Sequence, residues 1–319
     1  MVGKVAKIEI SRIEGAWQTD EGFPQPDWKI IGDAIRRDYP DEKERAAAWQ
    51  EAVQQWAGII QYALGRETYS LYQSKRTLIV TAKSGFAARG LLGICDAAVK
   101  QIQYRLGKLV CDMTVWKPVV FFFDDLDVYY RYISHFYSEG REHVQNGGIF
   151  LPRGYPHVAI PPGQRYQRPD ETVVHELTHF GLRKLHLPRW LNEGLAVAME
   201  SEVLGSRISQ TDIERLKETQ VHWNAENIQG FWRGDSFMNS EETRESYLTA
   251  RVLVQNVWKE FPEFQEFVRD ASPADGGEAS ALKYLGISLS DVAASFLGEG
   301  DWTPKLPAAE PADAPGAEM

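Results

Sequence analysis

The segment ETVVHELTHFGLRKLHLPRWLNEGLAVAME, residues 171–200, holds the sequence motif that decides how the fold and function of the chain are interpreted. It holds two histidines four residues apart, His175 and His179, and Glu176 directly follows the first. On a helix, side chains at positions i and i+4 lie on one face, one turn apart. Both imidazoles can then reach one metal ion at about 2.0–2.1 Å. Glu176 can lie beside that ion without binding it, where a general base for water is needed.

A catalytic zinc site needs a third protein ligand and an open position for water. A third histidine in the pattern HExxHxxGxxH is excluded, because Leu182 and Leu185 occupy the positions of the glycine and the histidine. A carboxylate on a following helix is the other candidate. Pro188 suits the start of such a helix, and Glu193 lies near its beginning. Two antiparallel helices joined by a short turn would bring Glu193 against the two histidines.

The alternative interpretation is an ordinary amphipathic helix, since an HExxH match arises by chance in roughly one chain in a hundred of this length. Three features favour the metal site. A carboxylate follows at a suitable distance, and an extended segment precedes the helix. Apolar neighbours also turn the histidines toward the interior, where polar groups need partners; these neighbours are Val173, Val174, Leu177 and Phe180.

The two motifs together, HELTH and LPRWLNEGLA, resemble the gluzincin-type zinc metallopeptidases, the thermolysin-like or peptidase MA-like superfamily. The resemblance covers about residues 76–260. It implies one Zn²⁺ per chain, held by His175, His179 and Glu193, with Glu176 as the catalytic base and no other cofactor. Zinc is preferred over calcium or magnesium, because imidazoles are poor ligands for hard cations.

The resemblance also implies an upper β-lobe whose edge strand binds the substrate as an added antiparallel strand. Residues 147–160 lie where that strand belongs. Related enzymes often place an acidic residue one turn after the glutamate ligand, but this chain has Val197 there. The acceptor that orients a zinc-bound histidine must then come from elsewhere, and Glu200 and a backbone carbonyl are the candidates.

An oxyanion donor is the last part that a peptidase site requires. The segment ESYLTARVLVQNVW, residues 245–258, resembles the helix that carries a catalytic tyrosine in related proteins, which nominates Tyr247. The alternative for Tyr247 is a packing aromatic. His222 and Tyr166 are weaker candidates. No partner motif accompanies His135, His143 or His157, so we expect surface or loop positions for these three histidines.

The composition and charge of the chain argue against several other classes of function. The chain has 319 residues, 43% of them hydrophobic, and a net charge of −10. An acidic balance argues against nucleic acid and against anionic lipid as partners, so a peptide or protein substrate is expected. Cys95 and Cys111 lie in apolar surroundings and read as core thiols. No membrane-spanning run or signal peptide is evident, so we expect a cytoplasmic protein; a trimmed secreted form is also compatible.

Strands and helices alternate in the first half of the chain. Residues 76–82 and 116–123 are typical of buried strands, and each precedes a helical stripe, at 84–107 and 124–137. This order predicts two parallel neighbouring strands joined by a right-handed crossover. Residues 146–163 give two short extended pieces broken by Gly and Pro, which is typical of a sheet edge.

Helical periodicity dominates the rest of the chain. A helix is predicted over residues 41–64, with Asp41 and Glu44 as a capping box. Further helices are predicted at 170–185, 190–204, 210–219, 240–260, 262–271 and 288–297. The fold class is α+β: a two-lobed metallopeptidase with a small mixed β-sheet lobe and a helical lobe carrying the zinc helix. The predicted boundaries are an extension at 1–75, an upper lobe at 76–165, a lower lobe at 166–300 and a disordered Pro/Ala-rich tail at 301–319.

Two classes of function fit these observations. The first is a zinc metallopeptidase, an endopeptidase or an aminopeptidase. The second is a non-catalytic zinc-containing peptide-binding or regulatory protein on a peptidase scaffold. A structural zinc site needs no base and is usually closed by four protein ligands. Glu176 and a set of only three ligands therefore favour the peptidase.

Overall fold

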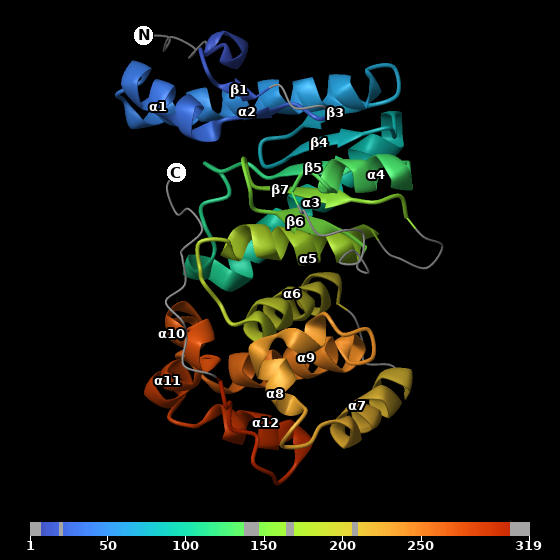
Figure 1. Ribbon diagram of the computed structural model, residues 1–319, viewed down its shortest axis with the longest axis vertical. Helices are drawn as coiled ribbons and strands as arrows, with labels where there is room; N and C mark the ends of the chain where they lie inside the picture. The colour runs from blue at the N-terminus through green and yellow to red at the C-terminus, as the bar shows by residue number, and fades with distance from the viewer. Residues whose placement is uncertain (1–7, 19–21, 137–146, 164–168, 206–209, 307–319) are drawn as a thin grey trace. The chain divides into compact units, whose positions relative to one another are not determined.

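The structure is a computed structural model that describes residues 8–18, 22–136, 147–163, 169–205 and 210–306. It is an α+β protein with a small mixed sheet and many helices (Figure 1). Contacts divide the chain into two compact units. The first consists of residues 1–100, 112–180 and 314–319, and the second of residues 101–111 and 181–313.

The first unit is built on a five-stranded sheet with the strand order β3-β4-β5-β7-β6. Its central strands β4, β5 and β7 are parallel, and β3 and β6 are antiparallel strands at the two edges of the described sheet. The predicted parallel pair and the predicted edge strand are thereby confirmed. The bounds are β3 Ser70–Gln73, β4 Leu78–Thr81, β5 Val119–Phe122, β6 Ile149–Leu151 and β7 His157–Ile160.

The central strands are buried on both faces, which explains why they read as continuous apolar runs. Every residue of β4, β5 and β7 is buried. Successive side chains point to opposite faces, and Phe121 is among those that face the N-terminal helices. A separate two-stranded sheet, β1 (Trp17–Gln18) and β2 (Gln25–Pro26), precedes these helices.

Helices cover both faces of the sheet (Figure 1). One face packs against α1 (Trp28–Asp38), α2 (Glu42–Gly65) and α4 (Leu126–Ile133) in a single aromatic-rich core. The other face is covered by α3 (Gly85–Leu106) and α5 (Pro169–Leu182). Asp41 caps α2, because its carboxylate accepts hydrogen bonds from the backbone N–H groups of Lys43 and Glu44, which is one half of the predicted capping box.

The second unit is helical. Its longest helices, α6 and α9, pack closely against each other. The helix bounds are α6 Arg189–Leu204, α7 Gln210–His222, α8 Ile228–Arg233, α9 Thr243–Glu260, α10 Phe264–Asp270, α11 Glu278–Ser280 and α12 Leu289–Leu297. A π-helical turn spans Ala281–Leu285, and 3-10 turns span Gly107–Leu109, Asp235–Phe237 and Pro273–Asp275. A further 3-10 turn, Ile10–Arg12, belongs to the first unit.

Part of the expected C-terminal tail is packed against this unit. Trp302 is only 6% exposed, and its carbonyl accepts a hydrogen bond from the indole of Trp232 at 2.8 Å. Gln229 donates to the carbonyl of Thr303 and accepts from the backbone N–H of Lys305. One large aromatic side chain and hydrogen bonds to the backbone of residues 302, 303 and 305 thus hold residues 301–306, although their composition predicts an unpacked segment.

Candidate metal centre

Helix α5 presents the histidine pair on one face. Val173, Val174, Leu177 and Phe180 are at most 1% exposed, so the opposite face is fixed in the core. The rings of His175 and His179 lie side by side, with centroids 4.8 Å apart and planes at 77°. The i, i+4 spacing therefore produces the predicted pair of neighbouring imidazoles.

Glu176 lies on the same helix and is 5% exposed. Its neighbour is the backbone that enters β6. A Cβ atom added to Gly148 would lie 3.3 Å from the Glu176 Cγ and 2.6 Å from the Thr172 Cγ2. Only a glycine allows this close approach, so the edge strand begins directly against the face of α5 that carries Glu176.

Helix α6 carries Glu193 in its second turn. Pro188 precedes the helix, and Trp190 anchors its first turn by donating its indole N–H to the carbonyl of Gly276 at 2.9 Å. Gly194 fixes the packing against α9, because an added Cβ would lie 2.6 Å from the Ala250 carbonyl oxygen. The sequence NEG thus combines a candidate ligand with a close helix crossing.

The three predicted ligands form a group. One ring nitrogen from each of His175 and His179 and one carboxylate oxygen of Glu193 all lie within 4.8 Å of one another. His179 and Glu193 are half-buried. Two imidazoles and one carboxylate are a donor set that suits zinc better than a hard cation. The donor set fits the metal that the sequence predicts.

The other predicted parts of the site have different outcomes. Tyr247 lies in α9, is half-buried, and packs edge-on against Phe237 at 5.3 Å between ring centroids. Val197 and Glu200 are half-buried residues of α6. The roles of Tyr247 as oxyanion donor and of Glu200 as acceptor stay predictions. Tyr166 lies outside the described residues.

The predicted surface or loop position of His157 is wrong. This histidine is a fully buried residue of β7, not a surface or loop residue. Its Nε2 is 2.8 Å from the Tyr132 hydroxyl, and its Nδ1 is 2.7 Å from the Tyr155 carbonyl oxygen. Burial lowers the pKa of His157 to about 4. The apolar residues that follow His157 in the sequence could have indicated a buried strand position. Nothing in the sequence indicated that Tyr132 is its partner.

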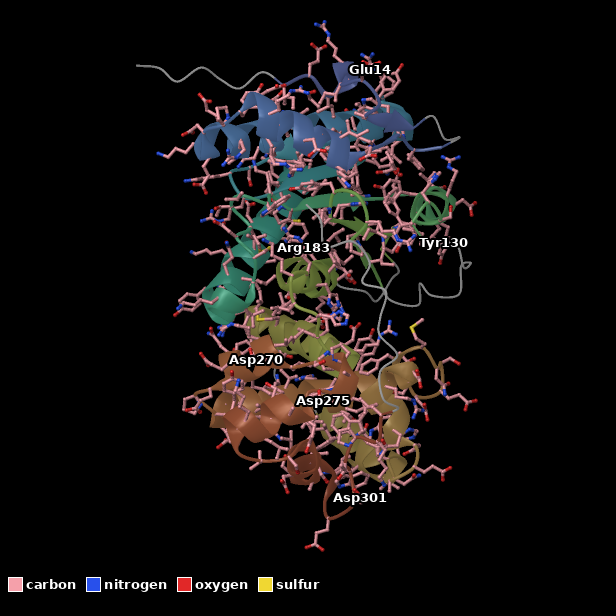
Figure 2. All side chains as sticks on the ribbon, turned by 60° about the vertical axis from the view of Figure 1, so that its left-hand side comes forward. Glu14, Tyr130, Arg183, Asp270, Asp275 and Asp301 are labelled. Atoms are coloured by element: carbon pink, nitrogen blue, oxygen red, sulfur yellow. The ribbon has the colours of Figure 1, made fainter. Side chains whose placement is uncertain are left out.

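His135 and His222 lie outside the group of candidate ligands, and both cysteines are buried. His135 is exposed, as expected, and stacks edge-on with Phe23. His222 is half-buried beside Trp223, and His143 lies outside the described residues. Cys95 and Cys111 are buried cysteines outside any disulfide of the described residues, which confirms the prediction of core thiols. Arg183, visible in Figure 2, donates to the Cys111 sulfur.

No family model matches the chain, and no curated protein matches it in sequence. Among the described helices, none combines the length and the apolar character needed to cross a lipid bilayer. The assignment of function therefore rests on the residues and geometry of α5, α6 and β6.

Proposed function

We propose that the protein is a zinc-dependent peptidase that hydrolyses peptide bonds through an activated water. The observation that carries this proposal is the group formed by His175, His179 and Glu193. These residues would hold one zinc ion and leave a coordination position open for water or substrate. When bound, zinc would polarise the substrate carbonyl and lower the pKa of water toward ~7.

Glu176 is the residue that would move protons. It directly follows His175 in the sequence, is nearly buried, and does not belong to the group of three donors. In the proposed reaction Glu176 accepts a proton from the attacking water and passes it to the leaving amine. Tyr247 would donate its hydroxyl to the oxyanion that develops on the carbonyl oxygen.

The edge strand β6 gives the substrate a place to bind. It pairs on one side with β7 and is the last strand in the described sheet. An extended peptide adds to such an edge through backbone hydrogen bonds, and its alternate side chains then determine selectivity. The contact of Gly148 with α5 supports this role, because it places the start of β6 next to Glu176. A two-lobed peptidase arrangement is part of the proposal.

A peptide-library digest with and without a chelator tests the proposal. We expect cleavage by the zinc-loaded protein, loss of cleavage after chelation, and recovery when zinc is returned. Cleavage that persists unchanged in zinc-free protein would exclude a zinc peptidase. Zinc-loaded protein that cleaves no member of a broad library would instead support a non-catalytic zinc protein.

A further inference from the structure

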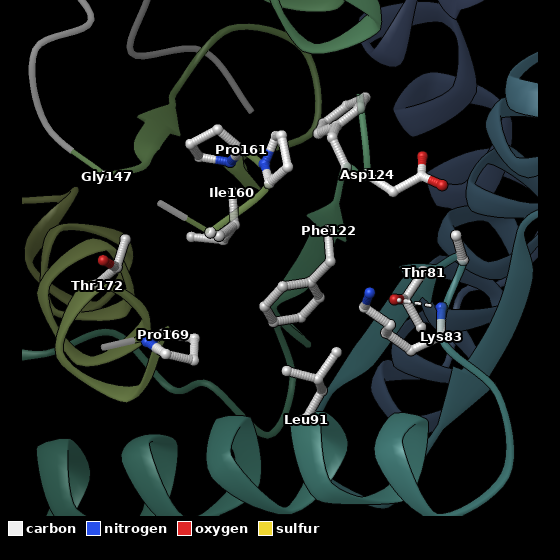
Figure 3. Close-up of a pocket in the computed structure, with 14 residues that line it drawn as sticks. Thr81, Lys83, Leu91, Phe122, Asp124, Gly147, Ile160, Pro161, Pro169 and Thr172 are labelled. Atoms are coloured by element: carbon white, nitrogen blue, oxygen red, sulfur yellow. Dashed lines mark hydrogen bonds between the residues drawn. The ribbon is translucent and has the colours of Figure 1, made fainter. Parts of the chain in front are cut away.

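A cavity of about 400 Å³ lies in the first unit beyond the carboxyl ends of β4, β5 and β7 (Figure 3). In sheets with parallel strands, ligands commonly bind at this end of the strands. The volume is near the lower limit of small-molecule sites, which span about 300–1,000 Å³. It therefore suits a ligand of the size of one or two amino-acid residues. Its walls are mainly apolar and include Leu91, Phe122, Ile160, Pro161 and Pro169.

Two charged side chains line the cavity, and they point in different directions. The Lys83 side chain extends toward Phe122 and the cavity, whereas the carboxylate of Asp124 points away from the cavity (Figure 3). Asp124 is engaged elsewhere, because it accepts a hydrogen bond from the hydroxyl of the buried Tyr69. Among the described residues the ammonium of Lys83 has no hydrogen-bond acceptor and no ion-pair partner. The cavity thus presents one cation against an apolar interior.

Thr172 connects the cavity with the candidate metal centre. It lines the cavity and lies four residues before Glu176, one turn away on the same face of α5. Gly147 also lines the cavity, and the next residue, Gly148, contacts both Thr172 and Glu176. A peptide that pairs with β6 and continues past its start would therefore reach the cavity mouth within about one helical turn of Glu176.

We propose that this cavity binds the C-terminal residue of a peptide, with its apolar side chain inside and its free carboxylate on Lys83. An apolar C-terminal residue supplies both groups from one Cα atom. An internal Asp or Glu residue supplies the carboxylate but no apolar branch. The cleavage implied by this binding, near the C-terminus of the substrate, rests on the proposed function; the binding itself does not.

The test is a binding measurement by titration calorimetry, with turnover prevented by the Glu176→Gln substitution. The probes are N-acetyl-alanyl-phenylalanine with a free carboxylate and the same compound as its C-terminal amide. We expect the free acid to bind about 10-fold more tightly, the lower end of the range for a hydrogen bond to a charged group, because Lys83 is exposed. The measurement is repeated in chelator, because a carboxylate could otherwise bind zinc directly. The preference must persist in zinc-free protein.

Substitutions of lysine assign the preference to the cavity. Lys83→Met keeps the apolar stem and should abolish the preference for the free acid, and Lys83→Arg should retain most of it. Lys100→Met is the matched control, because Lys100 is an exposed residue of α3 outside the cavity. Equal binding of acid and amide by the parent protein, or an undiminished preference in Lys83→Met, would overturn the proposal.

A third probe separates the terminal carboxylate from an acidic side chain. N-acetyl-alanyl-glutamate amide carries its only carboxylate on the side chain. It should bind about as weakly as the phenylalanine amide, and equal affinity with the free acid would overturn the C-terminal assignment. A carboxylate preference without peptidase activity would contradict the proposed function alone. Peptidase activity without the preference would contradict the cavity proposal alone.

Discussion

His157 on β7 and the histidine pair on α5 are two different ways of placing imidazoles inside this protein. His157 is fully buried, and both of its ring nitrogens lie within hydrogen-bond distance of protein oxygens. His175 and His179 instead face each other and share a carboxylate neighbour, Glu193. The first arrangement keeps a neutral ring as a packing element, whereas the second gathers lone pairs where a cation can bind. Burial alone therefore does not identify a functional histidine; the partners of its nitrogens do.

The largest expected effect comes from changing Glu176, the proposed base, which lies on α5 with the proposed ligands His175 and His179. Glu176→Gln keeps the shape of the side chain but removes its ability to accept a proton. Turnover of a cleaved peptide should fall by roughly 10³–10⁴-fold, at the upper end of general acid–base contributions. Zinc content and peptide binding should be unchanged. Steady-state kinetics with metal analysis of the same samples measures both, and unchanged turnover would remove Glu176 from the mechanism.

Tyr247→Phe should have the next largest effect. Loss of an oxyanion donor typically reduces kcat by roughly 10²–10³-fold. The ring of Tyr247 packs against Phe237, and phenylalanine preserves this contact, so the variant should remain folded. A kcat within about twofold of the parent value would show that Tyr247 is a packing aromatic.

His157 should make the free energy of unfolding depend on pH. Its pKa is lowered from 6.5 to about 4 in the folded protein, so the unfolded chain binds the extra proton between these values. The stabilisation is complete above pH 6.5 and is lost as the pH falls toward 4. The loss amounts to about 3 kcal/mol, at about 1.4 kcal/mol per pKa unit.

Urea unfolding at pH 7 and at pH 4.5 measures this loss. His157→Gln removes the titrating group, so the variant should lose less stability than the parent between the two pH values, whatever its absolute stability. Its zinc content at pH 7 should equal that of the parent. An identical pH dependence in parent and variant would show that His157 is not the group responsible.

Gly194→Ala should have the smallest effect and concerns the position of Glu193. The added methyl group would meet the Ala250 carbonyl of α9, which should reduce the free energy of unfolding by about 1–3 kcal/mol. Gly58→Ala in α2 is the matched control, because nothing lies within 4 Å of its added Cβ. That substitution should stabilise the helix by up to about 1 kcal/mol. Chemical denaturation of both variants tests the comparison, and equal effects would contradict the close α6–α9 crossing.

Periodicity and end signals predicted the parts of the fold whose contacts are local in sequence. The stripe of α2 and its cap at Asp41 were readable, as were the buried strands β4 and β5. Helix α1 was missed although Asp27 caps it and Ile31 and Ile35 repeat at helical spacing. Strand β3 was missed because SLYQ is a short edge segment with a partly exposed pattern.

The candidate site shows the same limit. The grouping of the histidine pair with Glu193 could be predicted, because two histidines four residues apart and a carboxylate on the next helix have the spacing typical of metal sites. The environment of His157 could not, since it depends on Tyr132, 25 residues away in sequence. The cavity was equally hidden, because its walls come from three strand ends and two helices that only the fold assembles. The packing of Trp302 depends in the same way on Trp232, 70 residues away.

X-ray absorption spectroscopy of the zinc-loaded protein tests the central claim most directly, because it counts the donor atoms around the metal. We predict a first shell of nitrogen and oxygen at about 2.0–2.1 Å, with the multiple scattering of two imidazoles. His179→Ala should retain the signature of one imidazole at most. A shell containing sulfur at about 2.3 Å, or an unchanged two-imidazole signal in His179→Ala, would contradict a centre built from His175, His179 and Glu193.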